Sequence, residues 1–490
     1  MIFALCCAVL SAAVILGGGT RSGFYGDVAV QLLAIPLLAA ALWPAFSQES
    51  PQRKSARAAL FVCAIAAFVV SLQVFPLPFD YWSGGAVFLP AGERALPATG
   101  PWTFSLTPEA SLAAGASLIP PLAIFAAVLQ LPLRQRLYLC WLLGGLGALS
   151  LGLGFLQVAQ GEASDLRFYE FTNPTEAVGF FANRNHFAAY LNVTLILAAF
   201  WLALAAEASF EARALGSRAL LWLAAAAAFL VADVAGLAMA RSRAGIGLAV
   251  AALLGIVLMA LRARSEGPAR EGRRSLARRA SLAAALFAVL FAAQFGLGGM
   301  LTRFEGDPLE DLRVAFNRTM LKTIPKALPL GTGLGSFVPV YATVERREDA
   351  FAGFANRAHN DFAELLLETG LLGAGLALAF LAWFLKRAFQ AWAARRQSGH
   401  SIEPLLERAA TLIIALLLFH SLVDYPLRTA ALSATLAVFC AILAVPALAL
   451  PASPAKAEHH RGGARRTSGP VPLAEKWDSG AGWPQSWQRR

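Results

Sequence analysis

The sequence is poor in charged residues and in cysteine. Only 14% of its 490 residues are Asp, Glu, Lys or Arg, whereas about 25% is usual in soluble domains. No Cys-x-x-Cys pair, zinc-site spacing or disulfide framework is present. The five cysteines lie inside apolar runs, where a thiol behaves as a small hydrophobic side chain: Cys6, Cys7, Cys63, Cys140 and Cys440. These deficits exclude a soluble enzyme, a disordered protein and a secreted disulfide-stabilised domain.

Apolar residues are abundant instead. Hydrophobic residues make up 58% of the chain and the mean hydropathy is +0.59. Apolar runs of 18 or more residues recur, and each is long enough to cross a bilayer as a helix. The first run begins at Met1 without a basic segment before it, so we interpret it as a retained helix, with a signal peptide as the alternative. The sequence predicts an all-α integral membrane protein with about twelve transmembrane helices, at 1–19, 27–46, 57–75, 110–131, 136–158, 186–206, 217–239, 243–261, 277–299, 362–385, 405–423 and 428–450.

The distribution of positive charge predicts the orientation. The net charge of +11 could indicate nucleic-acid binding, but in a membrane protein such an excess marks cytoplasmic loops. Stretch 262–279 alone contains seven arginines, which places it and both termini in the cytoplasm. We therefore predict a transmembrane domain over 1–450 with a large, partly helical periplasmic loop at 300–361. A disordered basic cytoplasmic tail at 451–490 would face anionic lipid headgroups.

Ionisable residues are rare inside the predicted helices, and Asp233 is the main exception. Ion-coupled transporters usually place carboxylates near the membrane midplane, so this scarcity disfavours transport. Arginine and histidine gather instead at the predicted outer ends of the helices, where permanently charged guanidinium groups suit phosphate oxygens. Snorkelling of arginines to lipid headgroups and structural roles for the histidines are the alternatives. The grouped residues are Arg184, Arg241, Arg243, Arg313, Arg318, Arg357, Arg428, His186, His359 and His420.

Two short segments in this region are similar to each other. Phe181-Ala-Asn-Arg-Asn-His186 and Phe354-Ala-Asn-Arg-Ala-His359 each precede a helix that enters from the predicted outer face. An internal duplication and coincidence are both open. A third motif, Gly331-x-Gly333-x-Gly335, has no βαβ context that would indicate nucleotide binding, and we interpret it as a tight re-entry toward the membrane.

Several of these stretches together resemble the O-antigen ligase and polysaccharide polymerase superfamily of bacterial inner-membrane glycosyltransferases. The resemblance covers roughly 180–430 and includes the predicted architecture of about twelve helices with one large periplasmic loop. The stretches that carry it are Phe181–Ala188, Ala240–Gly245, Leu330–Phe337 (LGTGLGSF), Arg357–Gly370 (RAHNDFAELLLETG) and His420–Arg428 (HSLVDYPLR).

The resemblance implies glycosyl transfer from undecaprenyl diphosphate to an acceptor hydroxyl at the periplasmic face. The histidine of the family's loop maps onto His359, as the base or orienting group for that hydroxyl. Its helix-start arginine maps onto Arg243, or alternatively Arg241, and its large-loop arginine maps onto Arg313, with Arg318 close by. Phe316 is a departure, because many relatives have Trp there.

The residue chemistry agrees with that reaction. A glycosyl diphosphate needs its departing negative charge stabilised, which fixed arginines do without a metal, and a histidine near neutral pKa suits the acceptor proton. We therefore predict no metal and no cofactor. Arg184 and Arg357 are added to the predicted diphosphate-binding residues, and Asp361, Glu368, His186, His420 and Asp424 are predicted to support the site. Glu364 and Glu368 are equally suited to the helix dipole or to supporting an arginine, and His420 and Asp424 are spaced for a structural hydrogen bond.

The expected function is an O-antigen ligase that uses lipid A–core as acceptor. A repeat-unit polymerase, which uses another lipid-linked glycan as acceptor, and a protein O-oligosaccharyltransferase are alternatives within the same superfamily. A lipid-linked sugar flippase or exporter is the alternative of another class, but it would be expected to line a central cavity with cations rather than one face. A structural membrane protein is disfavoured by the grouping of histidine and arginine. Nucleic acid is not an expected partner.

Overall fold

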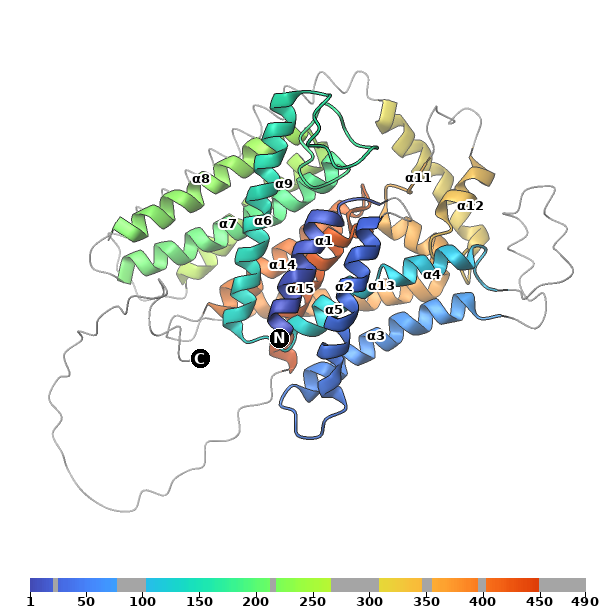
Figure 1. Cartoon of the computed structure of the whole chain (residues 1–490), viewed down its shortest axis with the longest axis horizontal. Helices are drawn as coiled ribbons and strands as arrows, with labels where there is room; N and C mark the ends of the chain where they lie inside the picture. The colour runs from blue at the N-terminus through green and yellow to red at the C-terminus, as the bar shows by residue number, and fades with distance from the viewer. Residues whose placement is uncertain are drawn as a thin grey trace, which may run out of the picture. The chain divides into compact units, whose positions relative to one another are not determined.

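A computed structural model describes residues 1–20, 25–76, 103–211, 217–265, 308–345, 355–394 and 402–448. Helices account for all the regular secondary structure of these residues (Figure 1). They are α1 (Ile2–Leu16), α2 (Tyr25–Leu42), η1 (Trp43–Ala45), α3 (Arg53–Val74), α4 (Pro108–Ala116), α5 (Ile119–Val128), α6 (Leu133–Gln160), α7 (Arg184–Glu211), α8 (Ser217–Ala240), α9 (Arg243–Ser265), α11 (Pro308–Ala327), α12 (Phe337–Val344), α13 (Asp361–Ala393), α14 (Glu403–His420), η4 (Pro426–Arg428) and α15 (Ala430–Leu448).

The helices confirm an all-helical membrane protein. Among the described residues, seven helical segments are long and apolar enough to cross a membrane, namely Tyr25–Ala45 (α2 and η1), Arg53–Val74, Pro108–Val128 (α4 and α5), Leu133–Gln160, Arg184–Ala205, Leu220–Ala240 and Asp361–Ala393. Eleven of the twelve predicted spans overlap a helix, while the span at 277–299 and the tail at 451–490 lie outside the described residues. The chain is therefore a multi-pass membrane protein, and the count of twelve spans stays a prediction.

One predicted span is divided in two. The expected helix at 110–131 is α4 followed by α5, with Ser117 and Leu118 between them. Pro120 and Pro121 form the first turn of α5. Proline lacks the backbone N–H that a continuing helix needs, but it is well tolerated at a helix start. The two prolines therefore explain why the chain restarts its helix here.

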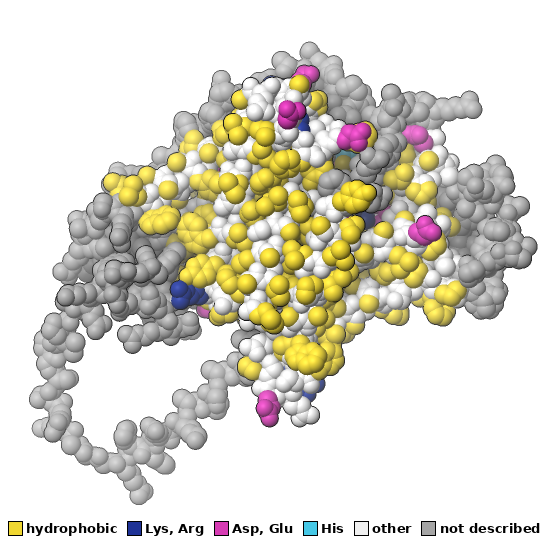
Figure 2. Space-filling view, in the orientation of Figure 1, with side chains coloured by type: hydrophobic (Ala, Val, Ile, Leu, Met, Phe, Trp, Pro, Cys, Tyr) yellow, Lys and Arg dark blue, Asp and Glu magenta, His cyan; other side chains and the backbone are white. Residues whose placement is uncertain are grey.

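Helix α7 forms the centre of one group of helices. It packs against α6, α8, α9 and α14, and 89% of its membrane-spanning window is buried, compared with 17% for α3. Helix α3 leaves Phe61 and Phe68 exposed, and Phe75, directly after the helix, is exposed as well. Figure 2 shows hydrophobic side chains across most of the visible described surface, with charged groups near its margins. An apolar exterior of this kind suits contact with lipid tails.

The connecting segments gather at two ends of the helices. At one end, which we call the site end, backbone hydrogen bonds join four pairs of segments: Ala431 N to Gly17 O, Ala182 N to Gly18 O, Ala177 N to Met239 O, and Asp361 N to Ser421 O. At the opposite end, side chains bond to the last carbonyls of neighbouring helices: Gln130 to Ala41, Arg57 to Ala45, and Arg408 to Ala394. This grouping matches the predicted alternation of helix direction, while the side of the membrane that each end faces stays a prediction.

The stretch 300–361, predicted as the large loop, contains two helices in its described part. Helices α11 and α12 share a small hydrophobic core with the start of α13, made of Phe316, Met320, Ile324, Ala327, Phe337, Val340, Tyr341, Ala355, Ala358 and Leu367. This core fixes the position of α11 relative to the first turns of α13. The partly helical character expected of 300–361 is thus present, and its periplasmic location stays a prediction.

The glycine motif after α11 closes onto a kink in α13. Gly331, Gly333 and Gly335 all have positive φ, and so does Gly370 inside α13 (φ 58°). Gly333 N donates to Glu368 O at 2.9 Å. A Cβ on Gly370 would lie 2.1 Å from the carbonyl oxygen of Pro329, two residues before the glycine motif, so only glycine fits. The motif is a tight turn that satisfies backbone groups freed by the kink, which explains the glycines without a nucleotide.

Candidate functional site

His359 lies at the site end, two residues before α13. Its backbone has φ 52°, in the left-handed region that non-glycine residues rarely adopt. Asn360 caps α13, because its side-chain oxygen accepts hydrogen bonds from Phe362 N and Ala363 N at 3.1 and 3.0 Å. A strained residue held at the start of a well-capped helix is typical of a functional position.

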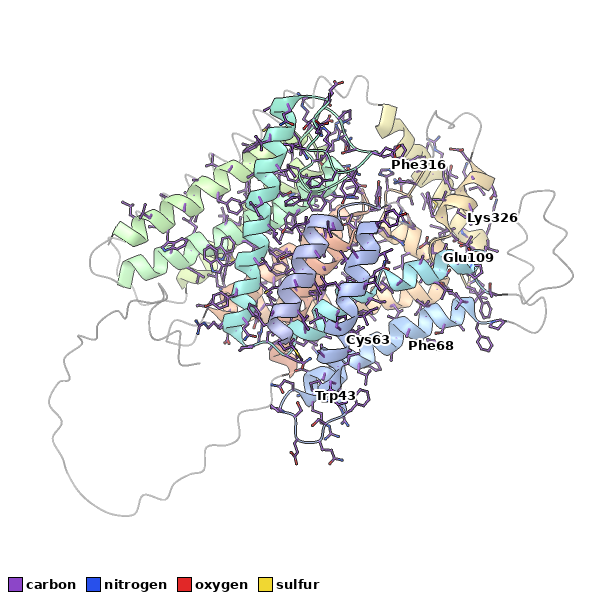
Figure 3. The ribbon with its side chains drawn as sticks, in the orientation of Figure 1. Trp43, Cys63, Phe68, Glu109, Phe316 and Lys326 are labelled. Carbon is purple, nitrogen blue, oxygen red and sulfur yellow. The ribbon has the colours of Figure 1, made fainter. Side chains whose placement is uncertain are left out.

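The His359 ring is held by three neighbours and remains partly open. Its Nδ1 lies 3.2 Å from Asp424 Oδ1, and 20% of its side chain is exposed. Phe316, on α11 (Figure 3), stacks against the ring with centroids 5.9 Å apart and planes 16° apart. Tyr425 meets it edge-on at 4.8 Å. Because the Asp424 carboxylate accepts a hydrogen bond from Nδ1–H, the lone pair of Nε2 is left available as a hydrogen-bond acceptor or base.

Asp424 is fully buried in the turn between α14 and α15. Its Oδ2 accepts a hydrogen bond from Asn185 Nδ2 on α7 at 2.5 Å, and its Oδ1 accepts from Tyr425 N at 3.0 Å. A buried carboxylate needs such donors to offset its lost hydration. Asp424 thereby joins α7 to the turn before α13 and fixes the orientation of His359.

The first turns of α13 hold a cluster of ion pairs. Asp361, Glu364 and Glu368 are buried and face Arg428 at 3.6, 3.4 and 3.1 Å, respectively. Burial alone lowers the pKa of Arg428, but the three carboxylates raise it above its usual value. Arg428 is therefore permanently charged here, and the cluster joins α13 to η4.

Two backbone segments are tied to the same carboxylates. Glu364 binds Arg357 Nη1 at 2.9 Å and also accepts a hydrogen bond from Ala358 N at 2.9 Å, directly before His359. Glu368 Oε1 accepts from Gly335 N at 2.9 Å in the glycine motif. The predicted supporting residues Asp361 and Glu368 thus organise the chain around His359. Both glutamates contact an arginine, and Glu364 also lies in the first turn of α13, where an acidic residue suits the helix dipole.

The arginines at the site end differ in their surroundings. Arg184 pairs with Glu176 at 2.7 Å, as Arg357 pairs with Glu364, so both contact a carboxylate. Arg241 is exposed with a left-handed backbone (φ 51°) in the turn between α8 and α9. Arg243 is the first residue of α9 and is partly buried.

The first turn of α9 lies beside the first turns of α7. Gly245 is so close to Ala188 that a Cβ on the glycine would lie 2.5 Å from the alanine Cβ, and Asn192 donates to Gly245 O at 3.0 Å. Helix α7 also supplies Asn185 to Asp424, so the two helix starts belong to one end of the bundle. Arg318 is exposed on α11, two residues after Phe316, whereas the side chain of Arg313 lies outside the described side chains.

His186 and His420 are both about 1% exposed, unlike His359. His186 meets the Tyr425 ring edge-on at 4.9 Å. His420 ends α14, and its carbonyl oxygen accepts backbone hydrogen bonds from Val423 and Asp424. Their burial suits structural roles and leaves His359 as the accessible histidine of the three.

Sequence reasoning did not assign Asn185, Tyr425 or Glu176 to the site. Asn185 and Tyr425 stand inside stretches that carried the family resemblance, but nothing local indicates that they meet. Burial and the neighbouring Asp424 raise the pKa of the Tyr425 hydroxyl to about 12, so it stays protonated. These contacts arise only once α7, α13 and the α14–α15 turn are packed together.

The described residues contain no group of three or more His, Cys, Asp or Glu side chains arranged to hold a metal ion. At the site end, Glu176, Asp361, Glu364 and Glu368 face arginines instead, whereas Asp424 contacts His359 and Asn185. The chemistry that these residues offer is proton transfer at His359 and anion binding by arginine.

Comparison with known proteins identifies a similar family for one part of the chain. The family model described as O-Antigen ligase matches residues 226–378, a segment that includes Arg243, Arg313 and His359. No curated protein matches the chain. Asp424 and Asn185 lie outside the matched segment. Only the folding of the chain brings them close to His359. Residues 226–378, about a third of the chain, are therefore similar to the O-antigen ligase family.

Proposed function

We propose that the protein is an O-antigen ligase that transfers a glycan from undecaprenyl diphosphate to a hydroxyl of lipid A–core at the periplasmic face of the inner membrane. The observation that carries the proposal is the His359–Asp424 pair, at 3.2 Å, in a chain with an O-antigen ligase domain. The partly exposed imidazole has its Nδ1 engaged and its Nε2 available, as a base for a hydroxyl acceptor requires.

The proposed reaction is a single displacement at the anomeric carbon of the glycan. The acceptor hydroxyl gives its proton to His359 Nε2 while its oxygen forms the new bond to that carbon. The bond from the carbon to the diphosphate oxygen breaks, and undecaprenyl diphosphate leaves with the electron pair. Asp424 stabilises the imidazolium that forms, by analogy with the carboxylate of a Ser-His-Asp triad.

Arginines would stabilise the leaving diphosphate. We assign this role to Arg243 and Arg313, with Arg241 and Arg318 as further candidates, because a guanidinium binds phosphate oxygens in a bidentate manner. Arg184 and Arg357 are given a smaller part, since each already contacts a glutamate. Fixed cations at the leaving group lower the barrier without a metal or a cofactor.

Deletion of the gene followed by analysis of lipid-linked and cell-surface glycans tests the proposal. Loss of full-length chains from lipid A–core, with polymerised glycan retained on undecaprenyl diphosphate, is the expected result. Single repeat units left on the lipid would indicate a polymerase instead, and loss of protein-linked glycan would indicate a protein O-oligosaccharyltransferase. Accumulation of the lipid-linked glycan on the cytoplasmic face would indicate a flippase and would overturn the proposal.

A further inference from the structure

The two similar segments, 181–186 and 354–359, meet at one tyrosine. The ring of Tyr425 is contacted edge-on by the histidine of each segment, His186 at 4.9 Å and His359 at 4.8 Å. Its hydroxyl is contacted by the asparagine of each segment, since Asn183 Nδ2 lies 3.5 Å away and Asn356 is a further hydrogen-bond partner. Equivalent residues of both segments therefore contact the same two parts of Tyr425.

The arginines of the two segments also match. Arg184 pairs with Glu176 at 2.7 Å, and Arg357 pairs with Glu364 at 2.9 Å. The first segment runs into α7, which begins at Arg184, and the second lies directly before α13, which begins at Asp361; both long helices begin at the site end. The similarity in sequence is thus accompanied by similarity in contacts, which coincidence in sequence alone would not produce.

The two segments differ where chemistry is concerned. His186 is about 1% exposed, whereas 20% of the His359 side chain is exposed. His359 also has a left-handed backbone and lies beside Asp424. The histidine of the 181–186 segment is therefore buried, whereas the histidine of the 354–359 segment is accessible to a substrate.

We propose that Tyr425 is a positioning residue that holds His359 in its reactive orientation, and that the 181–186 segment serves as a fixed support for Tyr425. Through His186 and Asn183, the 181–186 segment holds the ring and the hydroxyl of Tyr425 in place. The contacts of Tyr425 with His359 and Asn356 then fix the position of those two residues. Edge-to-face aromatic contacts of this kind are directional, so they define an orientation as well as a distance. The proposal deepens the proposed function, because it rests on His359 as the base.

Kinetic analysis of Tyr425 and His186 variants in proteoliposomes, with a lipid-diphosphate-linked glycan donor, tests this role. Tyr425→Leu removes both ring contacts and should lower kcat by about 10²-fold with little change in donor KM, as expected for a misplaced catalytic group. Tyr425→Phe keeps the ring and loses only the hydroxyl contacts, so a loss of about three- to tenfold is expected. His186→Phe, which retains an aromatic edge, should keep more activity than His186→Ala.

A second measurement does not depend on glycosyl transfer. Diethyl pyrocarbonate modifies neutral imidazole, and the rate at His359 can be followed by peptide mass spectrometry, with His459 and His460 as references for the reagent. Tyr425→Leu should raise the rate at His359 at least threefold, because one shielding ring is lost, whereas Tyr425→Phe should leave it unchanged.

The outcomes separate the two proposals. An unchanged modification rate in Tyr425→Leu would overturn the positioning role whatever the activity, and so would equal activity losses in the Leu and Phe variants or a change confined to KM. If Tyr425→Leu raises the modification rate at His359 but the wild-type protein does not transfer glycan from the lipid-diphosphate-linked donor, Tyr425 positions His359 and the proposed donor is wrong.

Discussion

Replacing Asp424 with asparagine tests how the carboxylate sets the state of His359. Asp424 Oδ1 accepts a hydrogen bond from Tyr425 N at 3.0 Å and lies 3.2 Å from His359 Nδ1, while Oδ2 accepts from Asn185 at 2.5 Å. Asparagine has nearly the same shape, but one of these oxygens becomes an NH2 donor. The substitution therefore changes the hydrogen-bond pattern while preserving the packing.

Neither orientation of the new amide reproduces the wild-type arrangement. If its NH2 group faces His359, Nδ1 must accept, Nε2 carries the proton, and the base is lost. If its NH2 group faces Asn185, two donors oppose each other. In both cases, the negative charge that stabilises an imidazolium is gone. We expect kcat to fall by about 10²–10⁴-fold, the range of general-base catalysis, which corresponds to roughly 2.7–5.5 kcal/mol in the barrier.

The assay is glycan transfer to the acceptor at matched levels of protein in the membrane. Asp233→Asn is a matched control, because Asp233 on α8 is also fully buried and accepts a hydrogen bond from Thr194 at 3.0 Å, but it is not among the residues that contact His359. The control should keep wild-type activity. Activity of Asp424→Asn within threefold of wild type would refute the role assigned to the carboxylate.

Three further predictions concern charge, backbone and topology. Arg243→Lys should lose about 2–4 kcal/mol of barrier lowering, because ammonium lacks bidentate geometry; unchanged transfer kinetics would indicate headgroup snorkelling. Gly370→Ala should destabilise the protein by roughly 1–3 kcal/mol, because its φ of 58° disfavours a side chain. Gly375→Ala, in the same helix with nothing within 4 Å of its new Cβ, should not lower the melting temperature in detergent, and equal effects of the two would contradict the kink argument. Single cysteines introduced at the exposed positions Lys322 and Gln52 should differ in labelling by a membrane-impermeant reagent on intact cells, with only the cysteine at 322 labelled. Labelling at 52 alone would show that the predicted topology is inverted.

The helices were largely predictable from the sequence, because an apolar run long enough to cross a bilayer has few alternatives to a helix. The interruption before α5 has a local cause as well, in Pro120 and Pro121. The kink at Gly370 was not predicted, because it depends on contact with the glycine motif some forty residues earlier. Kinks of that kind need tertiary partners.

The site was predictable only in part. His359 was predicted from a short motif and its resemblance to a family, and its place before a helix was confirmed by α13. Its partner Asp424 was predicted only as a supporting residue, because the two are brought together by packing. The roles of the arginines were harder to predict. The sequence does not show that Arg184 and Arg357 pair with Glu176 and Glu364, so it cannot separate them from arginines that are able to bind a diphosphate.

The central claim is that His359 is the base for glycan transfer from undecaprenyl diphosphate. The most direct measurement is the transfer rate of purified, reconstituted protein supplied with a lipid-diphosphate-linked glycan and lipid A–core, comparing wild type with His359→Ala and His359→Asn. The account predicts transfer by wild type and a loss of about 10²–10⁴-fold in both variants, because neither alanine nor asparagine has a basic nitrogen. Wild-type rates in His359→Ala would contradict the claim and leave catalysis to the arginines and to positioning.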